Sequence, residues 1–188
     1  MAVQDKIRLT VEEFDRLVDL PENADRLFEY IGGEAVEVPS NPRVSEIASI
    51  LNFYISLHLE QKGIEGHVTG EAGGYIVSGE KYAPDVAYVS AARQLELAKK
   101  GYNPIAPELA VEVISPNDQE DKITVKVGNY LAAGVLVWLV RSDEHQIQVY
   151  APGQAVKVLG LTDTLDGGDV LPGVAIPVSK IFKKLGSK

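Results

Sequence analysis

Apolar residues recur along the chain at helical spacing in some stretches and at strand spacing in others, with Gly- and Pro-containing segments between them. A capping-box pattern, Thr10 to Glu13, marks the start of the first helix. In the first half of the chain the pattern predicts a helix over 11–19, a hairpin over 27–38 with its turn at Gly32-Gly33, a helix over 44–61, strands over 67–77 and 82–89, and a charged surface helix over 91–100. A strand over 108–115, a helix that carries Lys122 and Lys126, and a strand over 135–140 are predicted next. The chain is then expected to form a hairpin of 146–150 and 155–159, followed by a tail of turns, one edge strand and a short helix ending at Phe182. The helix over 44–61 is expected to bury the face that carries Ile47, Ile50, Leu51, Tyr54, Leu57 and His58.

The strand over 108–115 is apolar on both faces, which is typical of a central strand covered on both sides. Val111 and Val113 share one face, and Ala110 and Ile114 share the other with Glu112. A carboxylate in such surroundings is costly unless it pairs with a cation, binds a metal or takes up a proton. Glu112 is therefore the first candidate for a functional residue.

Composition narrows the class of protein. The chain has 188 residues, 45% of them apolar and 24% charged, without a linker long enough to divide it, so we expect one domain over 1–188. It has no cysteine, hence no thiolate metal site. The first ten residues lack a signal-peptide core and the longest apolar run, 131–140, is too short for a bilayer, so we expect a cytoplasmic protein without a membrane partner.

The net charge of −9 argues against broad, non-specific nucleic-acid binding, which needs a basic face. It leaves room for a local basic patch, or for a site in which metal ions offset carboxylates. The common motifs for nucleophilic hydrolases, dinucleotides, phosphate-cradling loops and zinc proteases are absent. The three histidines, His58, His67 and His145, are far apart in sequence, so we interpret them as structural residues rather than metal ligands.

Two carboxylates and a lysine remain as candidate chemistry. Asp85 begins a strand and Glu112 lies within the next core strand. Converging carboxylates can hold Mg²⁺, which prefers oxygen ligands and keeps several waters for a phosphate substrate. A neighbouring lysine can position the attacking water and stabilise charge on the phosphate.

Helix phase separates the two lysines. The helix that carries them, which Asn117 or Asp118 can cap, is expected to bury Ile123, Val127, Tyr130, Leu131 and Gly134. Lys126 lies roughly 80° from the centre of that face and Lys122 roughly 120°. Lys126 is therefore expected to reach along the sheet towards Glu112, and Lys122 to reach solvent.

Several motifs, in order over nearly the whole chain, resemble the Uma-two type restriction endonucleases, a family long labelled a domain of unknown function. They are LTVEEF (9–14), FEYIGGEAVEV (28–38), NPR (41–43), PDVAYVS (84–90), PELAVEVISP (107–116), K-x-x-x-Y from Lys126 to Tyr130, AGV (133–135) and DTL with VLPG (163–173). Each motif is weak alone, but their co-occurrence is specific. The resemblance implies an α/β (mixed α+β) fold with a restriction-endonuclease-like, PD-(D/E)xK core: a central mixed sheet flanked by helices, with extra N-terminal and C-terminal hairpins.

The resemblance also implies the roles of individual residues. Asp85 matches the PD aspartate and Glu112 the second acid, both as metal ligands, and the backbone carbonyl of Val113 would be a further ligand. Glu29 matches an acidic residue in the family's first hairpin. The superfamily's usual lysine position is Ile114 here, and Lys126 takes that role from the following helix.

One departure concerns the turn after the last core strand, where family members often carry Asp-Pro. This chain has Arg141-Ser142-Asp143 instead. Any role that rests on that turn is therefore not carried over.

The function implied is an endonuclease that hydrolyses phosphodiester bonds with Mg²⁺ or Mn²⁺. The expected partners are DNA and a second copy of the chain in a homodimer. The main alternative, favoured by the acidic charge, is a non-catalytic binding or regulatory module with the nuclease fold, again homodimeric. A third interpretation is a hydrolase of a small phosphate compound in a narrow, closed pocket. A catalytic nuclease should show a Lys/Arg rim around Asp85 and Glu112.

Each candidate also has a purely structural interpretation. Asp85 could stabilise a turn after proline. Glu112 and Lys126 could form a buried ion pair without catalytic use. Glu29 and Glu34 could be solvated hairpin residues.

Overall fold

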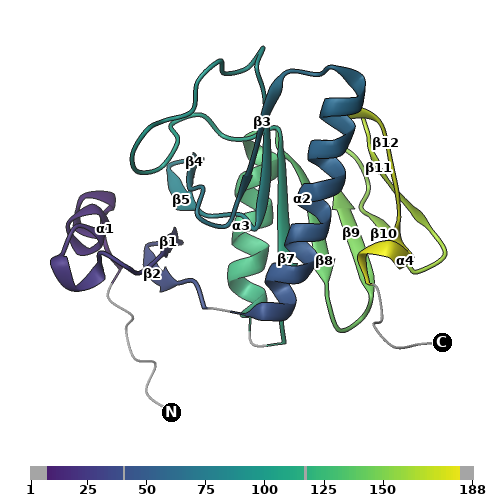
Figure 1. Cartoon of the computed structure of the whole chain (residues 1–188). Helices are drawn as coiled ribbons and strands as arrows, with labels where there is room; N and C mark the ends of the chain where they lie inside the picture. Colours follow the sequence, from purple (N-terminus) through teal and green to yellow (C-terminus); the bar gives the residue numbers. More distant parts are fainter. Residues whose placement is uncertain (1–7, 40, 117, 183–188) are drawn as a thin grey trace.

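A computed structural model of the chain describes residues 8–39, 41–116 and 118–182. Its centre is a six-stranded sheet of order β10-β9-β8-β7-β6-β3 (Figure 1). The strands are β3 (Gly66–Gly70), β6 (Val86–Ser90), β7 (Leu109–Ile114), β8 (Leu136–Arg141), β9 (Gln146–Tyr150) and β10 (Lys157–Leu159). β7 and β8 are parallel and the other neighbours are antiparallel, so the sheet is mixed, as predicted.

One helix covers each face of this sheet. α2 (Pro42–Lys62) packs on the face that carries Val111 and Trp138, and α3 (Glu120–Ala132) packs on the face that carries Ala110 and Val137. The parallel pair β7 and β8 is joined through α3, the usual crossover for parallel strands. The strand predicted to be covered on both sides is β7, and the structure confirms that prediction.

A second sheet of four strands, order β2-β1-β5-β4, lies at the N-terminal end of the molecule (Figure 1). It consists of the predicted hairpin β1 (Phe28–Ile31) and β2 (Glu34–Glu37) and of the hairpin β4 (Tyr75–Val77) and β5 (Glu80–Tyr82), joined where Tyr30 pairs with Lys81. Helix α1 (Val11–Val18) has the predicted capping box, and the short 3-10 helix η1 (Pro21–Asn23) follows it. Lys81 fixes α1 to this sheet by its ion pair with Asp15.

The C-terminal part forms a two-stranded sheet of β11 (Thr164–Gly167) and β12 (Leu171–Pro177), followed by α4 (Val178–Ile181). Its apolar side chains join the core on the α2 side of the central sheet. The tail therefore has one strand more than predicted, because β11 lies in the segment interpreted as turns.

Three predicted elements differ from the structure. The stretch 91–100 is not a helix, because the nearby Asn103 side chain holds it as a loop: Asn103 accepts a hydrogen bond from the Ala98 amide at 3.1 Å and exchanges two with Gln94. The predicted strands 67–77 and 82–89 each divide between the two sheets. The first of these strands is interrupted between β3 and β4. A glycine is needed there, since a Cβ at Gly74 would lie 2.5 Å from the Tyr102 ring.

The buried stripe of α2 is rotated from the predicted one. It consists of Ile47, Ala48, Leu51, Ile55 and Leu59, while Ile50, Tyr54, Leu57 and His58 are only partly buried. The helix ends as predicted at Gly63, whose φ of 63° is left-handed. Among the described residues, none of the helices has both the length and the apolar character needed to span a bilayer.

Candidate active site

The pairing of β6 with β7 brings Asp85 and Glu112 together. Val86 pairs with Val111 and Ala87 pairs with Ala110. Extending this register by one residue places Asp85 beside Glu112, on the face of the sheet that α3 covers. The carboxylate of Asp85 accepts a hydrogen bond from the Val113 amide at 2.6 Å. The antiparallel register therefore places Asp85, the residue directly before β6, beside Glu112 on β7.

Lys126 extends from α3 into the same region and is 8% exposed. Its Nζ donates to Glu112 Oε2 at 2.7 Å and to Glu29 Oε1 at 2.8 Å. The predicted phase of Lys126 on the helix is confirmed. Glu29, on β1, also accepts a hydrogen bond from the Ala83 amide at 2.7 Å, so it is a buried residue of the cluster and not a solvated hairpin residue.

The prediction for Lys122 was wrong. Its side chain is 18% exposed, and its Nζ lies 3.1 Å from a carboxylate oxygen of Glu34 on β2. The hairpin of β1 and β2 lies over this side of α3 and pairs with Lys122, which the helix phase alone would direct to solvent. Glu34 is likewise partly buried rather than a solvated hairpin residue.

Sequence reasoning missed the contact of Tyr130, which was interpreted as a core aromatic residue. It is fully buried, and its hydroxyl donates to Glu112 Oε1 at 2.8 Å. The spacing of four residues from Lys126 places both side chains on one face of α3, and this spacing is the signal that could have identified the contact.

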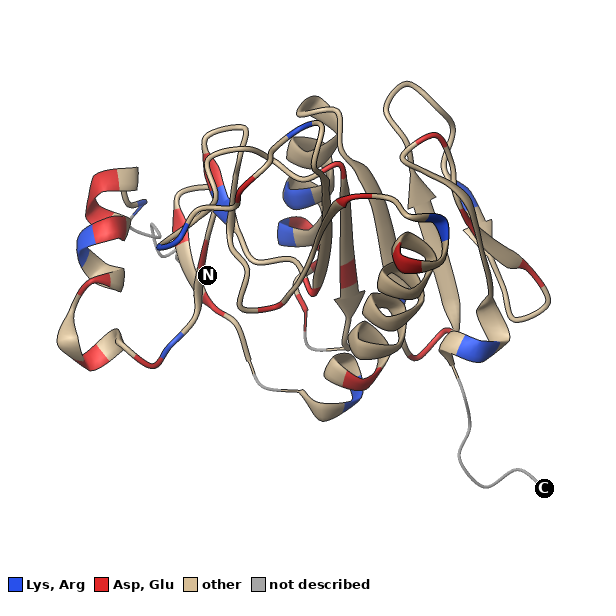
Figure 2. Cartoon of the chain, turned by 45° about the horizontal axis from the view of Figure 1, so that its top comes forward, with Lys and Arg blue, Asp and Glu red and all other residues tan. Residues whose placement is uncertain are grey.

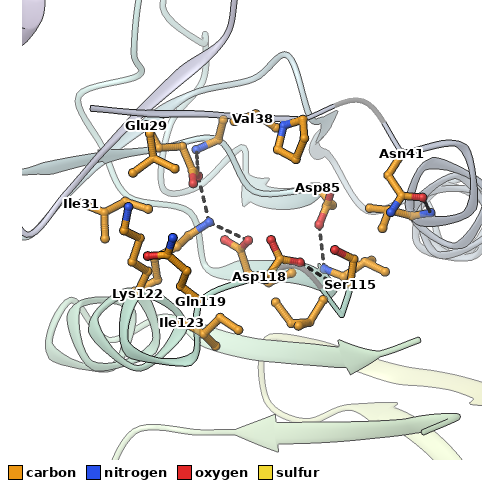
Figure 3. A pocket seen from close by; sticks show the side chains of 18 of the residues that line it. Glu29, Ile31, Val38, Asn41, Asp85, Ser115, Asp118, Gln119, Lys122 and Ile123 are labelled. Atoms are coloured by element: carbon orange, nitrogen blue, oxygen red, sulfur yellow. Dashed lines mark hydrogen bonds and ion pairs between the residues drawn. The ribbon is translucent and has the colours of Figure 1, made fainter. Parts of the chain in front are cut away.

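One cavity of about 300 Å³ lies beside this cluster, and Tyr130 and Glu34 are not part of its lining. Figure 3 shows Glu29, Asp85 and Lys122 around it, with Ile31 and Val38 from the first hairpin and Asn41 from the start of α2. Of the predicted site residues, the cavity lining includes Glu29, Asp85, Glu112, Val113 and Lys126. The sequence-predicted set is therefore brought together in full.

The cavity is rich in acidic residues. Its lining carries the carboxylates of Glu29, Glu37, Glu71, Asp85, Glu112 and Asp118 but only two described basic side chains, Lys122 and Lys126. Both lysines are paired with carboxylates. Figure 2 shows Lys and Arg positions interspersed with Asp and Glu positions along the described elements. The Lys/Arg rim expected of a catalytic nuclease is not found among the described lining residues.

Burial and shared charge shift the acid–base properties of the cluster. Burial raises the pKa of Asp85 to about 7, against the Val113 hydrogen bond and the charge of Lys126. Burial also raises the pKa of Glu112, against the charge of Lys126. Burial lowers the pKa of Lys126, but the charges of Glu112 and Glu29 outweigh burial and raise it above the ordinary value. The pKa values of Glu112 and Lys126 can both be raised, because the charge of one ammonium group does not compensate for the charges of several carboxylates and their burial.

The donor set suits a hydrated divalent cation. Asp85, directly before β6, and Glu112, on β7, offer hard oxygen donors, and the surplus of carboxylates over lysine favours added positive charge. Within the described ranges no group of three or more His, Cys, Asp or Glu residues could hold a metal. Mg²⁺ is commonly bound through only one or two carboxylates because it retains several waters, so two acids are sufficient.

Polar contacts around the end of β7 fix the neighbouring turns. Arg141 forms a two-point ion pair with Glu120 at 2.7 and 3.0 Å, and Ser142 donates to the Ile114 carbonyl. The turn that departs from the family pattern therefore connects β8 to β7 and to the start of α3. Asp118 accepts a hydrogen bond from the Ser115 amide and does not cap α3, and Asn117, the other predicted cap, lies outside the described residues.

Two of the histidines have backbone contacts remote from the cavity lining. His58 Nε2 lies 3.1 Å from the Pro172 carbonyl, and His67 Nε2 lies 3.1 Å from the Leu95 carbonyl. The ring of His145 packs against Phe182. These contacts agree with their interpretation as structural residues.

Comparison with known proteins gives a family and a fold. The Uma2 family, described as "Putative restriction endonuclease", matches residues 11–179. A crystal structure described as "a putative nuclease belonging to DUF820", from Anabaena variabilis, superimposes with a TM-score of 0.77 at 23% identity, over 93% of this chain and 97% of that one. No curated protein matches the chain. The match over most of its length shows that the chain belongs to the Uma2 family.

Proposed function

We propose that this protein is a Mg²⁺- or Mn²⁺-dependent endonuclease that hydrolyses phosphodiester bonds of DNA. The observation that carries the proposal is the convergence of Asp85, Glu112 and Lys126 in one cavity of a protein of this family. Hydrolysis adds water across a P–O bond and leaves a phosphate monoester and a hydroxyl group. DNA as the substrate rests on the family alone.

In this proposal Asp85 and Glu112 would hold the metal through carboxylate oxygens, and the Val113 carbonyl would be a further ligand. A bound divalent ion would neutralise charge on the phosphate and lower the pKa of its water. The hydrogen bond from the Val113 amide orients Asp85 for this task. Both acids would bind the metal in their ionised forms, because a metal ligand must be deprotonated.

Lys126 acts as a cation and not as a base, because its raised pKa keeps it protonated at neutral pH. An ammonium has three N–H donors, and Glu29 and Glu112 take two of them. We assign the third to the attacking water or to a phosphate oxygen, where it would stabilise the charge that develops in the transition state. Glu29 is then a positioning residue, since it accepts a hydrogen bond from Lys126 Nζ.

The test is a titration of Mg²⁺ and Mn²⁺ against double-stranded DNA, single-stranded DNA, RNA and a small phosphodiester, with Glu112→Gln prepared identically. The expected result is metal-dependent cleavage by the wild type that falls by about 10²-fold or more in the variant. Cleavage at equal rates by both proteins would indicate a contaminant and remove the support for the proposed site. Turnover of the small phosphodiester alone would instead favour the small-phosphate hydrolase.

The acidic lining of the cavity favours a second candidate, a non-catalytic module that keeps the nuclease fold as a homodimer. A duplex brings one negative charge per ~1.7 Å of helix axis and would meet carboxylates at Glu37, Glu71 and Asp118. This candidate predicts no cleavage with any substrate at millimolar Mn²⁺, and a dimer in sedimentation. Metal-dependent cleavage that Glu112→Gln abolishes would exclude it.

A further inference from the structure

Glu112 has a hydrogen-bond donor on each of its two carboxylate oxygens. Tyr130 donates to Oε1 at 2.8 Å and Lys126 donates to Oε2 at 2.7 Å. The carboxylate torsion of a glutamate is broad, so a single donor would leave the plane of the group free to turn. Two donors on opposite oxygens, both from α3, fix the plane of Glu112 relative to the cavity.

The hydroxyl of Tyr130 is not needed to fill space. The ring is fully buried and packs against Tyr82 with 5.3 Å between ring centroids, which a phenylalanine could match. A buried phenol oxygen requires a hydrogen-bond partner, and in the described residues its partner is Glu112.

We propose that Tyr130 is a positioning residue that holds the Glu112 carboxylate in the orientation required for metal binding. The inference rests on the proposed function, because it concerns Glu112 as a metal ligand. Carboxylates that ligate metals are commonly fixed by such hydrogen bonds, and the loss of one typically costs about 10- to 100-fold in metal affinity. A purely structural tyrosine would instead affect stability without affecting metal affinity.

Tyr82 provides a matched control. It lies beside Tyr130, is equally buried, and its hydroxyl hydrogen-bonds to Glu80 and Asn129 but not to Glu112. Replacing either tyrosine with phenylalanine removes one buried hydroxyl and keeps the ring. The two variants should therefore lose similar stability and differ in metal binding.

The experiment is calorimetric titration of the full chain with Mn²⁺ alone, using wild type, Tyr130→Phe, Tyr82→Phe, Glu112→Gln and the double variant Tyr130→Phe with Glu112→Gln. We expect Tyr130→Phe to weaken Mn²⁺ binding by about 10- to 100-fold and Tyr82→Phe to leave it within about twofold. Tyr130→Phe should add no loss in the Glu112→Gln background, because it acts through that carboxylate. Thermal melts of each variant verify that it is folded.

The outcomes separate the inference from the proposed function. If the wild type binds Mn²⁺ and Tyr130→Phe binds it equally well, the positioning role is wrong and the metal site stands. If both tyrosine variants weaken binding equally, the effect is one of general stability and the inference is again wrong. If the wild type binds no Mn²⁺ at millimolar concentration, the proposed function fails, and the inference fails with it.

Discussion

Lys126 is a single buried ammonium shared between two carboxylates that lie far apart in sequence, Glu29 and Glu112. A buried charge costs free energy in proportion to its desolvation, and its partners offset that cost only while they are present. The arrangement is therefore sensitive to the loss of any one member.

Replacing Lys126 with methionine should lower the free energy of unfolding by about 3–5 kcal/mol, because two buried carboxylates lose their counter-charge. Any cleavage should fall by about 10²–10³-fold, the usual effect of removing one transition-state contact. Urea denaturation and single-turnover cleavage measure the two effects.

Lys122→Met is the matched control on the preceding turn of α3, and its ion pair with Glu34 is only partly buried. We expect a loss of about 1 kcal/mol or less, with cleavage retained. An inactive Lys122→Met beside an active Lys126→Met would show that the catalytic lysine has been misassigned.

The raised pKa of Asp85 predicts a pH dependence of stability. Between its ordinary 3.8 and its folded value of about 7, the folded protein holds a proton that the unfolded chain has released. The contribution of Asp85 to the free energy of unfolding should therefore decrease as pH rises from about 4 to 7. Thermal melts without metal should show wild type losing stability relative to Asp85→Asn over this range, and parallel curves would contradict the assignment.

The candidate site was predictable at the level of charged residues. Glu112 stands out as a carboxylate in an otherwise apolar strand, and helix phase gave the direction of Lys126. The position of Lys122 was not predictable, because it depends on a hairpin more than 80 residues earlier in the chain. The hydroxyl contact of Tyr130 was missed because an aromatic residue on a buried helical face has an adequate explanation in packing alone.

At the scale of elements, the helix ends were predicted correctly where signals from residues close in sequence determine them. The capping box of α1 and the glycine at the end of α2 are such signals. The loop at 91–100 is the opposite case, since charged residues favour a helix there but the Asn103 side chain and the backbone around Gly74 stabilise a different path. In such segments tertiary contacts override the helix propensity of the individual residues.

Two glycines, one directly after α2 and one within α3, should respond oppositely to replacement by alanine. Gly63 ends α2 with a left-handed φ of 63°, so Gly63→Ala should cost about 1–2 kcal/mol. Gly128 lies on the exposed side of α3 with open space around it, so Gly128→Ala should stabilise by about 0.5–1 kcal/mol. Urea denaturation of both variants measures the difference, and a destabilised Gly128→Ala would indicate a contact at that position in the folded state.

At the scale of the molecule, the fold class followed from the order of helices and strands together with the family motifs. The separation of the six-stranded sheet from the four-stranded sheet did not, because the strands predicted at 67–77 and 82–89 contribute to both of these sheets. The net charge of −9 pointed to an acidic surface, and the acidic lining of the cavity shows that this character continues into the candidate site.

Metal binding should stabilise the whole molecule in a pH-dependent manner. Ligand carboxylates must be ionised, so Mn²⁺ should raise the melting temperature more at pH 8 than at pH 6. At a hundred times the dissociation constant, the gain in unfolding free energy is about 2.7 kcal/mol. Thermal melts with and without Mn²⁺ test this, with Glu112→Gln as the control. An equal shift in both proteins would place the metal elsewhere.

The first hairpin meets the remainder of its sheet where Tyr30 pairs with Lys81, yet it supplies Glu29, which lies 97 residues from Lys126. The amide of Ala83 donates to the same carboxylate. If the hairpin separates while β7 and β8 remain paired, that amide becomes accessible to solvent and the core amides do not. Deuterium uptake at Ala83, compared with that at Val111, would therefore measure how often the site loses Glu29 without global unfolding.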